Sequence, residues 1–421
     1  MNGTEGATRK AIEAVWRIES ARLIGGLVRV VKDVGLAEDL AQEALLVAFE
    51  RWPSAGIPDN PGAWLMATAK NRAIDELRRR RMLDRKHEQL GSEARAEFTP
   101  SGRDIETVID EGVEDDVLRL ALVACHPVLS TEGRVALTLR LLGGLSTEEI
   151  ARAFLLPEPT IAQRIVRAKR TLSEAKVPFE VPRGADLSAR TGSVLEVIYL
   201  IFNEGYSATK GEDWLRPALC EDACRLGRIF AERVPGEAEV HGLVALLELQ
   251  SSRAAARVGP TGQPILLLEQ DRGRWDQLLI GRGLASLARA ESLARPLGPY
   301  TLQAAISACH ARARTAAETD WARIVALYDA LAELTQSPVV ELNRAVAVAM
   351  AFGPAEGLEL VDELADEPAL SGYHLLPSVR GDLLFKLGRL SEAEKEFERA
   401  AFMTQNVRER ELLLDRAKGC R

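Results

Sequence analysis

Residues 60–81, NPGAWLMATAKNRAIDELRRRR, carry side chains that could contact a nucleic acid. Asn60 followed by Pro61 is typical of a helix start, and the helical period then gathers the apolar residues on one face. The opposite face holds Trp64 with Thr68, Asn71, Arg72, Asp75 and Arg79. An aromatic ring beside arginines suits stacking on nucleobases next to neutralised phosphates. On helix geometry alone, the pattern favours a solvated basic helix whose Trp64 packs on a neighbouring segment.

Residues 144–173, GLSTEEIARAFLLPEPTIAQRIVRAKRTLS, have the layout of a helix-turn-helix. Ser146 and Glu149 form the S-x-x-E capping box of a first short helix, and residues 155–157 supply the turn. The second helix is predicted to bury Ile161, Ile165, Val166 and Ala168. Its other face carries Thr160, Gln163, Arg164, Arg167 and Arg170. Bidentate donors near the start of such a helix, followed by basic residues, favour base recognition in a DNA duplex.

Residues 36–52, LAEDLAQEALLVAFERW, form a strongly periodic helix with two different faces. The wider face is apolar and is expected to be buried. The narrower face carries Glu38, Asp39, Gln42, Glu43 and Glu50, with Leu46 and Phe49 among them. Such a face suits docking to a basic partner helix. By itself, however, the pattern favours an ordinary solvated face.

The composition indicates a mostly helical chain of two or three domains, with 421 residues, 47% hydrophobic side chains and a net charge of −8. The charge is segregated, because residues 1–176 hold 26 basic and 27 acidic side chains and the remaining −7 lies in residues 177–421. Within the first part, eight bases cluster at 69–86, and seven acids without a base cluster at 104–116. We find no signal-peptide core, no membrane-spanning run and no disulfide pattern in the five scattered cysteines. We therefore expect a cytoplasmic protein without membrane contact.

No group of residues supports catalysis, a cofactor or a metal site. Cys220 and Cys224 lie one helical turn apart, but no third or fourth metal ligand is evident. The Cys–His pairs at 125–126 and 309–310 lie in apolar helices and are expected in the core. The cluster LEQDRGRWD at 268–276 could form a small-molecule site, although a buried salt-bridge network between helices is the favoured interpretation. We expect that the protein is not an enzyme.

The chain beyond residue 187 is predicted to be a larger helical region with internal repeats near its end. Ala345, Val348, Gly357, Val361 and Leu364 recur as Gly381, Leu384, Ala393, Phe397 and Ala400, at an offset of 36 residues. Small residues where two helices touch, with larger residues on the second helix, are typical of tetratricopeptide (TPR) hairpins. The best copy lacks the expected tryptophan and closing proline, so the repeats are described as TPR-like.

Taken together, these segments resemble bacterial sigma factors of the extracytoplasmic-function (ECF) type over about residues 12–176. The 36–52 helix resembles the family's core-polymerase-binding helix, the 60–81 helix its promoter-opening and −10-reading helix, and 144–173 its −35 reader. NEGYSAT (203–209), LEQDRGRWD and TDWARIVALYDAL (319–331) further resemble the sigma-factor group with a C-terminal TPR-like domain.

The expected organisation is all-α, in five parts. A sigma region 2-like domain spans 8–86, and its first stretch, 8–34, is predicted to be a helix pair interrupted near Gly25–Gly26. An acidic flexible linker spans 87–116. A sigma region 4-like helix-turn-helix domain spans 117–176. A short linker over 177–187 then leads to a TPR-like extension over 188–421.

The resemblance implies three sets of contacts. The −10 element would be bound by Asn60, Trp64, Lys70, Asn71, Arg72, Arg78 and Arg79, with a flipped-out base held in the loop 53–60. The −35 element would be bound by Thr160, Gln163, Arg164, Arg167 and Arg170. Core RNA polymerase would be bound by Asp39, Gln42, Glu43 and Leu46. Many family members have lysine where this chain has Ala162, which puts one contact at that position in doubt.

Other classes of protein fit parts of the sequence. A duplex-binding transcriptional regulator would use only the helix-turn-helix, with the TPR-like repeats as an oligomerisation domain. A scaffold would use only the repeats, but the intact basic residues at 70–81 and 163–170 argue against it. The charge asymmetry also raises the hypothesis that the acidic extension contacts the basic faces of the same chain and regulates them.

Overall fold

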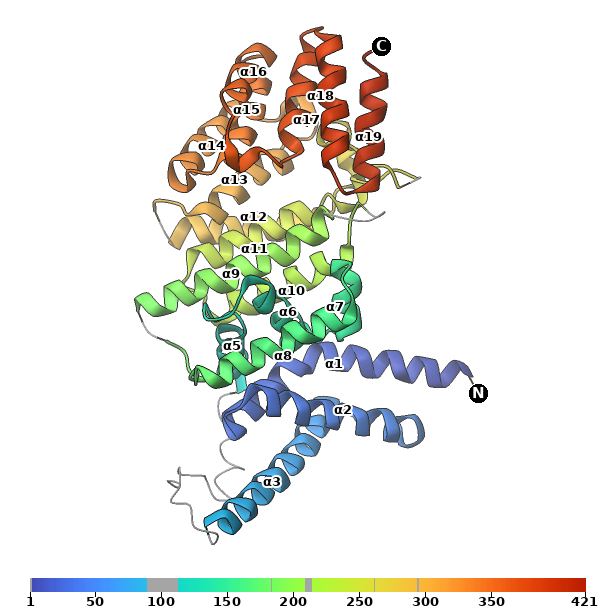
Figure 1. The fold of residues 1–421 in the computed structure, drawn as a ribbon, viewed down its shortest axis with the longest axis vertical. Helices are drawn as coiled ribbons and strands as arrows, with labels where there is room; N and C mark the ends of the chain where they lie inside the picture. The colour runs from blue at the N-terminus through green and yellow to red at the C-terminus, as the bar shows by residue number, and fades with distance from the viewer. Residues whose placement is uncertain (1, 89–112, 183, 209–213, 261, 294) are drawn as a thin grey trace. The chain divides into compact units, whose positions relative to one another are not determined.

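The computed structural model of the chain describes residues 2–88, 113–182, 184–208, 214–260, 262–293 and 295–421. These residues form α-helices joined by short connections and 3-10 turns, and they contain no β-sheet (Figure 1). The predicted all-α fold is confirmed. By its internal contacts the chain divides into two compact units, residues 1–197 and residues 198–421. In the part that the structure describes, no helix has both the length and the apolar composition that a bilayer crossing requires.

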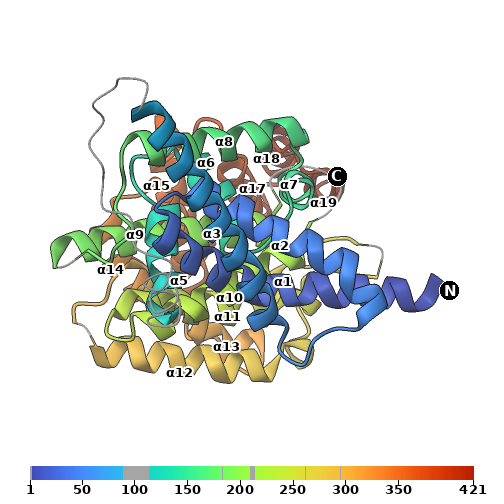
Figure 2. The same ribbon diagram turned by 90° about the horizontal axis from the view of Figure 1, so that it is seen from below.

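Three long helices form the first half of unit 1, namely α1 (Asn2–Val31), α2 (Val34–Ala55) and α3 (Pro61–Glu88). Each of them packs against the other two (Figure 2). Their shared core includes the fully buried side chains of Leu27, Trp52 and Leu65. The start of α3 is capped as predicted, because the Asn60 Oδ1 atom accepts a hydrogen bond from the Ala63 N–H at 3.0 Å.

Helix α1 is continuous, so the predicted interruption near Gly25–Gly26 is wrong. The two glycines mark close approach of other segments instead of a break. A Cβ atom on Gly25 would lie 2.9 Å from the carbonyl oxygen of Asp116 in α5 (Val113–Ala124), and one on Gly26 would lie 3.3 Å from the Met66 side chain. Glycine weakens a helix by about 0.5–1 kcal/mol relative to alanine. Here it lets α5 and α3 lie directly on α1.

The predicted helix-turn-helix consists of α7 (Thr147–Phe154) and α8 (Glu158–Glu174), which lie with α6 (Thr131–Leu141) in the second half of unit 1. The capping box is confirmed, since Ser146 Oγ accepts from the Glu149 N–H at 3.1 Å and Glu149 Oε2 accepts from the Ser146 N–H at 2.7 Å. Leu155 ends α7 in the left-handed conformation, with φ of 49°. That residue turns the chain into α8.

Helix α9 (Ala185–Tyr206) runs across the boundary between the two units. Its first half is attached to unit 1, because Ser193 Oγ donates to the Cys125 carbonyl at 2.6 Å and Arg134 donates to Ser193 Oγ at 2.7 Å. Arg134 also pairs with Glu196 at 2.8 Å. Burial raises the pKa of the Cys125 thiol to about 12, so this thiol stays protonated in its core position. Residues 89–112, most of the predicted acidic linker, lie outside the described residues.

Unit 2 is a succession of packed helices. They are α10 (Pro217–Arg233), α11 (Ala238–Ser251), α12 (Gln277–Leu293), α13 (Pro299–Arg312), α14 (Trp321–Thr335), α15 (Pro338–Phe352), α16 (Pro354–Glu363), α17 (Leu375–Lys386), α18 (Leu390–Met403) and α19 (Val407–Lys418). From α13 onward each helix packs against the next one along the chain, as the orange and red helices of Figure 1 show.

The 36-residue offset in the sequence corresponds to two successive helix pairs, α15 with α16 and α17 with α18. A Cβ atom on Gly357 would lie 2.8 Å from the Ala345 carbonyl oxygen, and one on Gly381 would lie 2.9 Å from the Phe397 ring. Phe397 is fully buried in the core that these helices share. The repeated small residues therefore permit close helix contact within each pair.

Arg272 connects the LEQDRGRWD segment to the end of α13 and the residues that follow it. Its guanidinium donates to the carbonyl oxygens of His310 and Ala313, each at 2.7 Å, and to Thr319 Oγ1 at 2.9 Å. These bonds cap the C-terminal end of α13. The segment does link helices, but through hydrogen bonds to backbone carbonyls and a hydroxyl, so the favoured salt-bridge interpretation is wrong in its chemistry. Burial, together with Arg253 and Arg272, lowers the pKa of the adjacent His310 to about 3.

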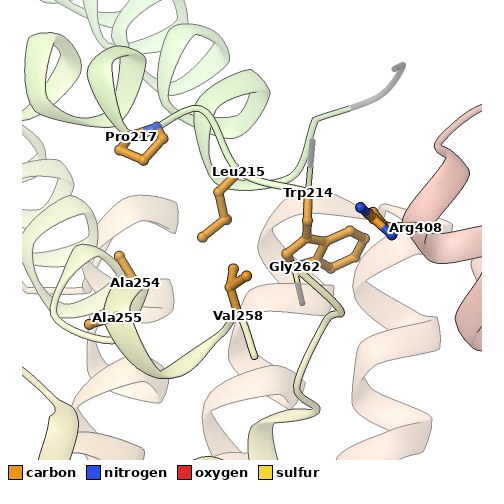
Figure 3. A pocket seen from close by; sticks show the side chains of 8 residues that line it. All are labelled: Trp214, Leu215, Pro217, Ala254, Ala255, Val258, Gly262 and Arg408. Carbon is orange, nitrogen blue, oxygen red and sulfur yellow. The ribbon is translucent and has the colours of Figure 1, made fainter. Parts of the chain in front are cut away.

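A separate pocket of about 410 Å³ lies in unit 2 between the α9–α10 connection, the residues after α11 and α19. Figure 3 shows Leu215 and Val258 pointing into it, with the Arg408 side chain beside Trp214. Arg408 is itself paired with Glu411 at 3.1 Å. The pocket is therefore mostly apolar, and the charge at its edge already has a partner.

Alanine at two glycines of unit 1 should have opposite effects on stability. Gly25→Ala should destabilise unit 1 by about 1–3 kcal/mol, because the new methyl group overlaps the α5 backbone. Gly192→Ala, on an exposed stretch of α9 where a Cβ meets nothing within 4 Å, should stabilise it by about 0.5–1 kcal/mol. Hydrogen–deuterium exchange of α1 peptides across a urea series measures both. Equal effects of the two substitutions would contradict the tight α1–α5 contact.

Candidate nucleic-acid interface

Helix α3 presents the predicted basic face to solvent. Asn71, Arg78 and Arg79 are exposed, whereas Lys70 and Arg72 are partly buried. The opposite side of the helix is buried as predicted, with Leu65, Ala69 and Ala73 at most 1% exposed. The side chains of Arg80 and Arg81 lie outside the described part. The exposed side therefore combines an amide with basic groups along two turns of the helix.

Trp64 lies against another aromatic side chain of the same unit. Its ring meets Trp52 edge to face, with centroids 5.3 Å apart and an interplanar angle of 68°. Trp52 is 2% exposed and Trp64 is half-buried. The interpretation in which Trp64 packs on a neighbouring segment is therefore correct in part, because the ring contacts Trp52 and remains partly exposed.

Some of the basic groups on α3 are paired within unit 1. Arg72 forms an ion pair with Glu43 of α2. Arg79 pairs with Glu76 at 2.9 Å, and Arg78 lies 3.7 Å from Asp75. Exposed pairs of this kind contribute at most about 1 kcal/mol each, so a phosphate can displace the acid. The Arg72–Glu43 pair joins the predicted DNA-binding face to the predicted polymerase-binding face.

The acidic face of α2 is exposed around one apolar side chain. Leu46 is 60% exposed, and Glu43 and Asp39 are exposed beside it, with Gln42 partly buried. An exposed leucine surrounded by acids is the arrangement expected of a docking surface for a basic partner. Helix α2 continues through Pro53 to Ala55, so the loop predicted over 53–60 is shorter and begins at Gly56.

Glu38 does not lie on the exposed acidic face, contrary to the sequence prediction. It is 3% exposed, and its carboxylate is held by Arg140 of α6 and Lys169 of α8. The Arg140 Nε atom donates to Glu38 Oε1 at 2.5 Å, and the Lys169 ammonium pairs with Oε2. One carboxylate thus connects α2 to two helices, α6 and α8, of the second half of unit 1. Helical periodicity could not predict this burial, because each partner is more than a hundred residues away.

Two more ion pairs connect the halves of unit 1. Asp116 at the start of α5 is fully buried and lies 3.4 Å from Arg29 of α1. Arg17 of α1 pairs with Glu149 of α7 at 2.8 Å. Burial by itself raises the pKa of Glu149, but hydrogen bonds from the Ser146 backbone and Arg17 outweigh it and lower that pKa overall. The carboxylate is therefore held in its charged form at the start of α7.

Helix α8 has a buried side and an exposed polar side. Ile161, Ile165 and Ala168 are buried as predicted, and Gln163, Arg167 and Arg170 are exposed. Thr160 and Arg164 are partly buried. Val166 was predicted to point inward, but it is 64% exposed, so that prediction is wrong. Lys169, three residues further along the helix, points inward instead, and its ammonium group pairs with Glu38.

Three family models match parts of the chain. Sigma-70 region 2 matches residues 18–82, which cover most of α1 to α3. Sigma-70 region 4 matches residues 119–172, which cover most of α5 to α8. A family of unknown function, DUF6596, matches residues 190–291, from α9 to α12. The two candidate DNA-contacting helices therefore lie in two separate sigma-70 regions.

The chain is also similar to several curated proteins. It is 42% identical over 387 residues to uncharacterized protein R00370 of Rhizobium meliloti (strain 1021), covering 92% of this chain and 90% of that protein. It is 30% identical to ECF RNA polymerase sigma factor SigK of Mycobacterium ulcerans (strain Agy99), covering 36% of this chain and 78% of that protein. It is 28% identical to probable ECF RNA polymerase sigma factor SigI of Mycobacterium tuberculosis (strain CDC 1551 / Oshkosh), of which it spans 57%. No solved structure matches the chain.

The carboxylate of Glu38 should be a main attachment between the halves of unit 1. Glu38→Gln should destabilise unit 1 by on the order of 1.5–3 kcal/mol, because it removes the carboxylate charge that faces Arg140 and leaves Lys169 with the more distant, exposed carboxylate of Asp39 at 3.7 Å. Glu50→Gln, at an exposed position of the same helix, should change stability by less than about 0.5 kcal/mol. Urea unfolding followed by hydrogen exchange in α6 and α8 peptides compares the two. Similar small effects would show that the pairing contributes little.

Proposed function

We propose that the chain, which belongs to the ECF RNA polymerase sigma factors, binds core RNA polymerase and selects promoters with two of its helices. Sigma factors of this family act in transcription initiation. In this proposal α8 reads a −35 element as duplex and α3 captures the −10 element as single strand. The acidic face of α2 docks on the polymerase, and unit 2 regulates the process or binds further partners.

The observation that carries the proposal is the exposed side of α8. Gln163, Arg167 and Arg170 are exposed on one side of a helix whose other side is packed against the rest of unit 1. Arg170 pairs with Glu174 of the same helix at 3.5 Å, an exposed contact that a phosphate can displace. An amide can pair with an adenine edge in the major groove, and the guanidinium groups can pair with guanine or with phosphate. Thr160 and Arg164 stand beside them and are assigned to base contacts as well.

The −10 contacts are assigned to α3 on similar grounds. Asn71 is exposed between the tryptophan and the arginines, so it can bond an unpaired base while Lys70, Arg72, Arg78 and Arg79 neutralise phosphates. The half-exposed ring of Trp64 offers aromatic surface for stacking, and Asn60 lies at the end of the loop that would receive a flipped base. Trp52 fixes the Trp64 ring from behind.

The polymerase contact is assigned to the exposed part of α2. Leu46 supplies an apolar anchor, and Asp39, Gln42 and Glu43 surround it. Charged residues at the edge of such a surface chiefly set the association rate and the choice of partner. Because Glu43 also holds Arg72, a basic polymerase segment that takes over Glu43 would release Arg72 toward DNA.

The role of unit 2 is proposed from charge. Residues 177–421 carry a net charge of −7, and the exposed sides of α3 and α8 are basic, so an intramolecular contact would shield the DNA-binding helices. A test by truncation must keep the first half of α9. Its Ser193 and Glu196 are partners of Arg134, and a chain that ends before them would take the ion pair and one hydrogen bond from this mostly buried guanidinium.

Run-off transcription tests the proposed function directly. Core bacterial RNA polymerase with the full chain should give a discrete transcript from DNA upstream of the chain's own gene, and core enzyme alone should not. The same transcript start locates the −35 and −10 elements. Binding of the chain to intact duplex without polymerase, together with no transcript, would support the alternative of a helix-turn-helix regulator with a TPR-like oligomerisation domain.

Two substitutions on α8 separate base contact from phosphate contact. Gln163→Ala should cost about 1–3 kcal/mol of binding at one base position and relax the sequence preference there. Arg170→Ala should weaken binding to all sequences alike and lower the slope of log affinity against log salt by about one. Competition binding of polymerase with the full chain, on promoter variants at several salt concentrations, gives both quantities. If both substitutions changed the sequence preference in the same way, the assignment of Gln163 to a base and Arg170 to a phosphate would be wrong.

A further inference from the structure

Val166 is an apolar side chain in the centre of the exposed side of α8. It is 64% exposed, whereas the buried side of the helix is already completed by Ile161, Ile165 and Ala168. Folding gains little from a valine in this place, because its methyl groups stay in water and its branched side chain weakens a helix slightly. The residue therefore contributes little to the stability of unit 1.

The helical register places Val166 among the polar side chains assigned to DNA. Gln163 precedes it by three residues and Arg170 follows it by four, and residues at these spacings are neighbours on a helix surface, about 5–6 Å apart. Arg167 is exposed directly beside it. A DNA groove that meets the amide and the two guanidinium groups must also lie against the Val166 methyl groups.

The floor of the major groove offers one apolar group, the C5-methyl group of thymine. The other base edges there are hydrogen-bond donors and acceptors, which lose water without compensation when a valine covers them. A valine at this position thus favours a thymine and disfavours the other bases.

We propose that Val166 contacts the C5-methyl group of a thymine in the −35 element and selects that base at one position. The proposal rests on the proposed function of α8 as the −35 reader. It adds an apolar, methyl-specific contact to the polar contacts of Gln163 and the arginines.

The test removes the methyl group from the DNA and, separately, the valine from the protein. Each thymine of the −35 element is replaced in turn by deoxyuridine, and promoter binding by core polymerase with the full chain is measured in competition. At one thymine the uracil template should bind roughly four-fold more weakly, the effect of one buried methyl group. Val166→Ala should show a similar loss on the thymine template and no further loss on the uracil template.

Val128→Ala is the matched control, because Val128 is another exposed valine of unit 1 and lies outside α8. It should bind both templates like the unchanged chain. Uracil without effect at every position, with transcription and the Gln163→Ala effect intact, overturns the Val166 assignment and leaves the proposed function standing. An equal loss by Val166→Ala on both templates also overturns it and assigns the residue to a protein partner. Absence of any promoter binding removes the proposed function and this inference together.

Discussion

The buried carboxylate of Glu38 is the interaction on which the arrangement of unit 1 depends. A charge at 3% exposure is unfavourable unless it is paired, and it is paired with two cations from two other helices. Arg140 and Lys169 are brought to it only when α6 and α8 lie on α2. The buried Asp116 and the Arg17–Glu149 pair connect the same two halves elsewhere. Charge pairing thus fixes which surfaces of the helices stay free.

Helix α8 shows how that constraint leads to function. Lys169 turns inward to Glu38, and its neighbour Arg170 and the residues one turn away then face solvent. The same attachment that holds the helix in unit 1 leaves Gln163, Val166 and Arg167 exposed on the side that is proposed to meet DNA. In α3, the Arg72–Glu43 pair has a comparable position between the two candidate binding faces. In the proposed function, binding of polymerase to Glu43 is therefore expected to change the affinity of Arg72 for DNA, and the reverse.

Unit 2 is stabilised by different interactions, namely close helix contacts at small residues and hydrogen bonds to backbone carbonyls. Its helices approach closely at small residues such as Gly357 and Gly381, and Arg272 satisfies the carbonyl groups at the end of α13. The neutral His310 next to Arg272 is consistent with a cationic, poorly hydrated surrounding. Part of this unit matches a family of unknown function, so the regulatory role proposed for it is argued from its net charge alone.

The sequence by itself determined the helices, the helix-turn-helix with its capping box, and membership of the sigma factors. The helices and the capping box depend on residue spacing within each segment, which can be interpreted without knowledge of the partner helices. Membership of the sigma factors was expected from the resemblance of these segments to that family. The sequence also predicted which side chains of α3 face solvent, and that Trp64 could pack on a neighbour. It did not determine the burial of Glu38, the exposure of Val166 or the continuity of α1 at Gly25. The burial of Glu38 depends on Arg140 and Lys169, which are distant in the chain, and Gly25 packs against the α5 backbone. The exposure of Val166 depends on which side of α8 the rest of unit 1 covers. Periodicity defines the faces of a helix, but only the packed tertiary structure decides which face is covered, and by which residue.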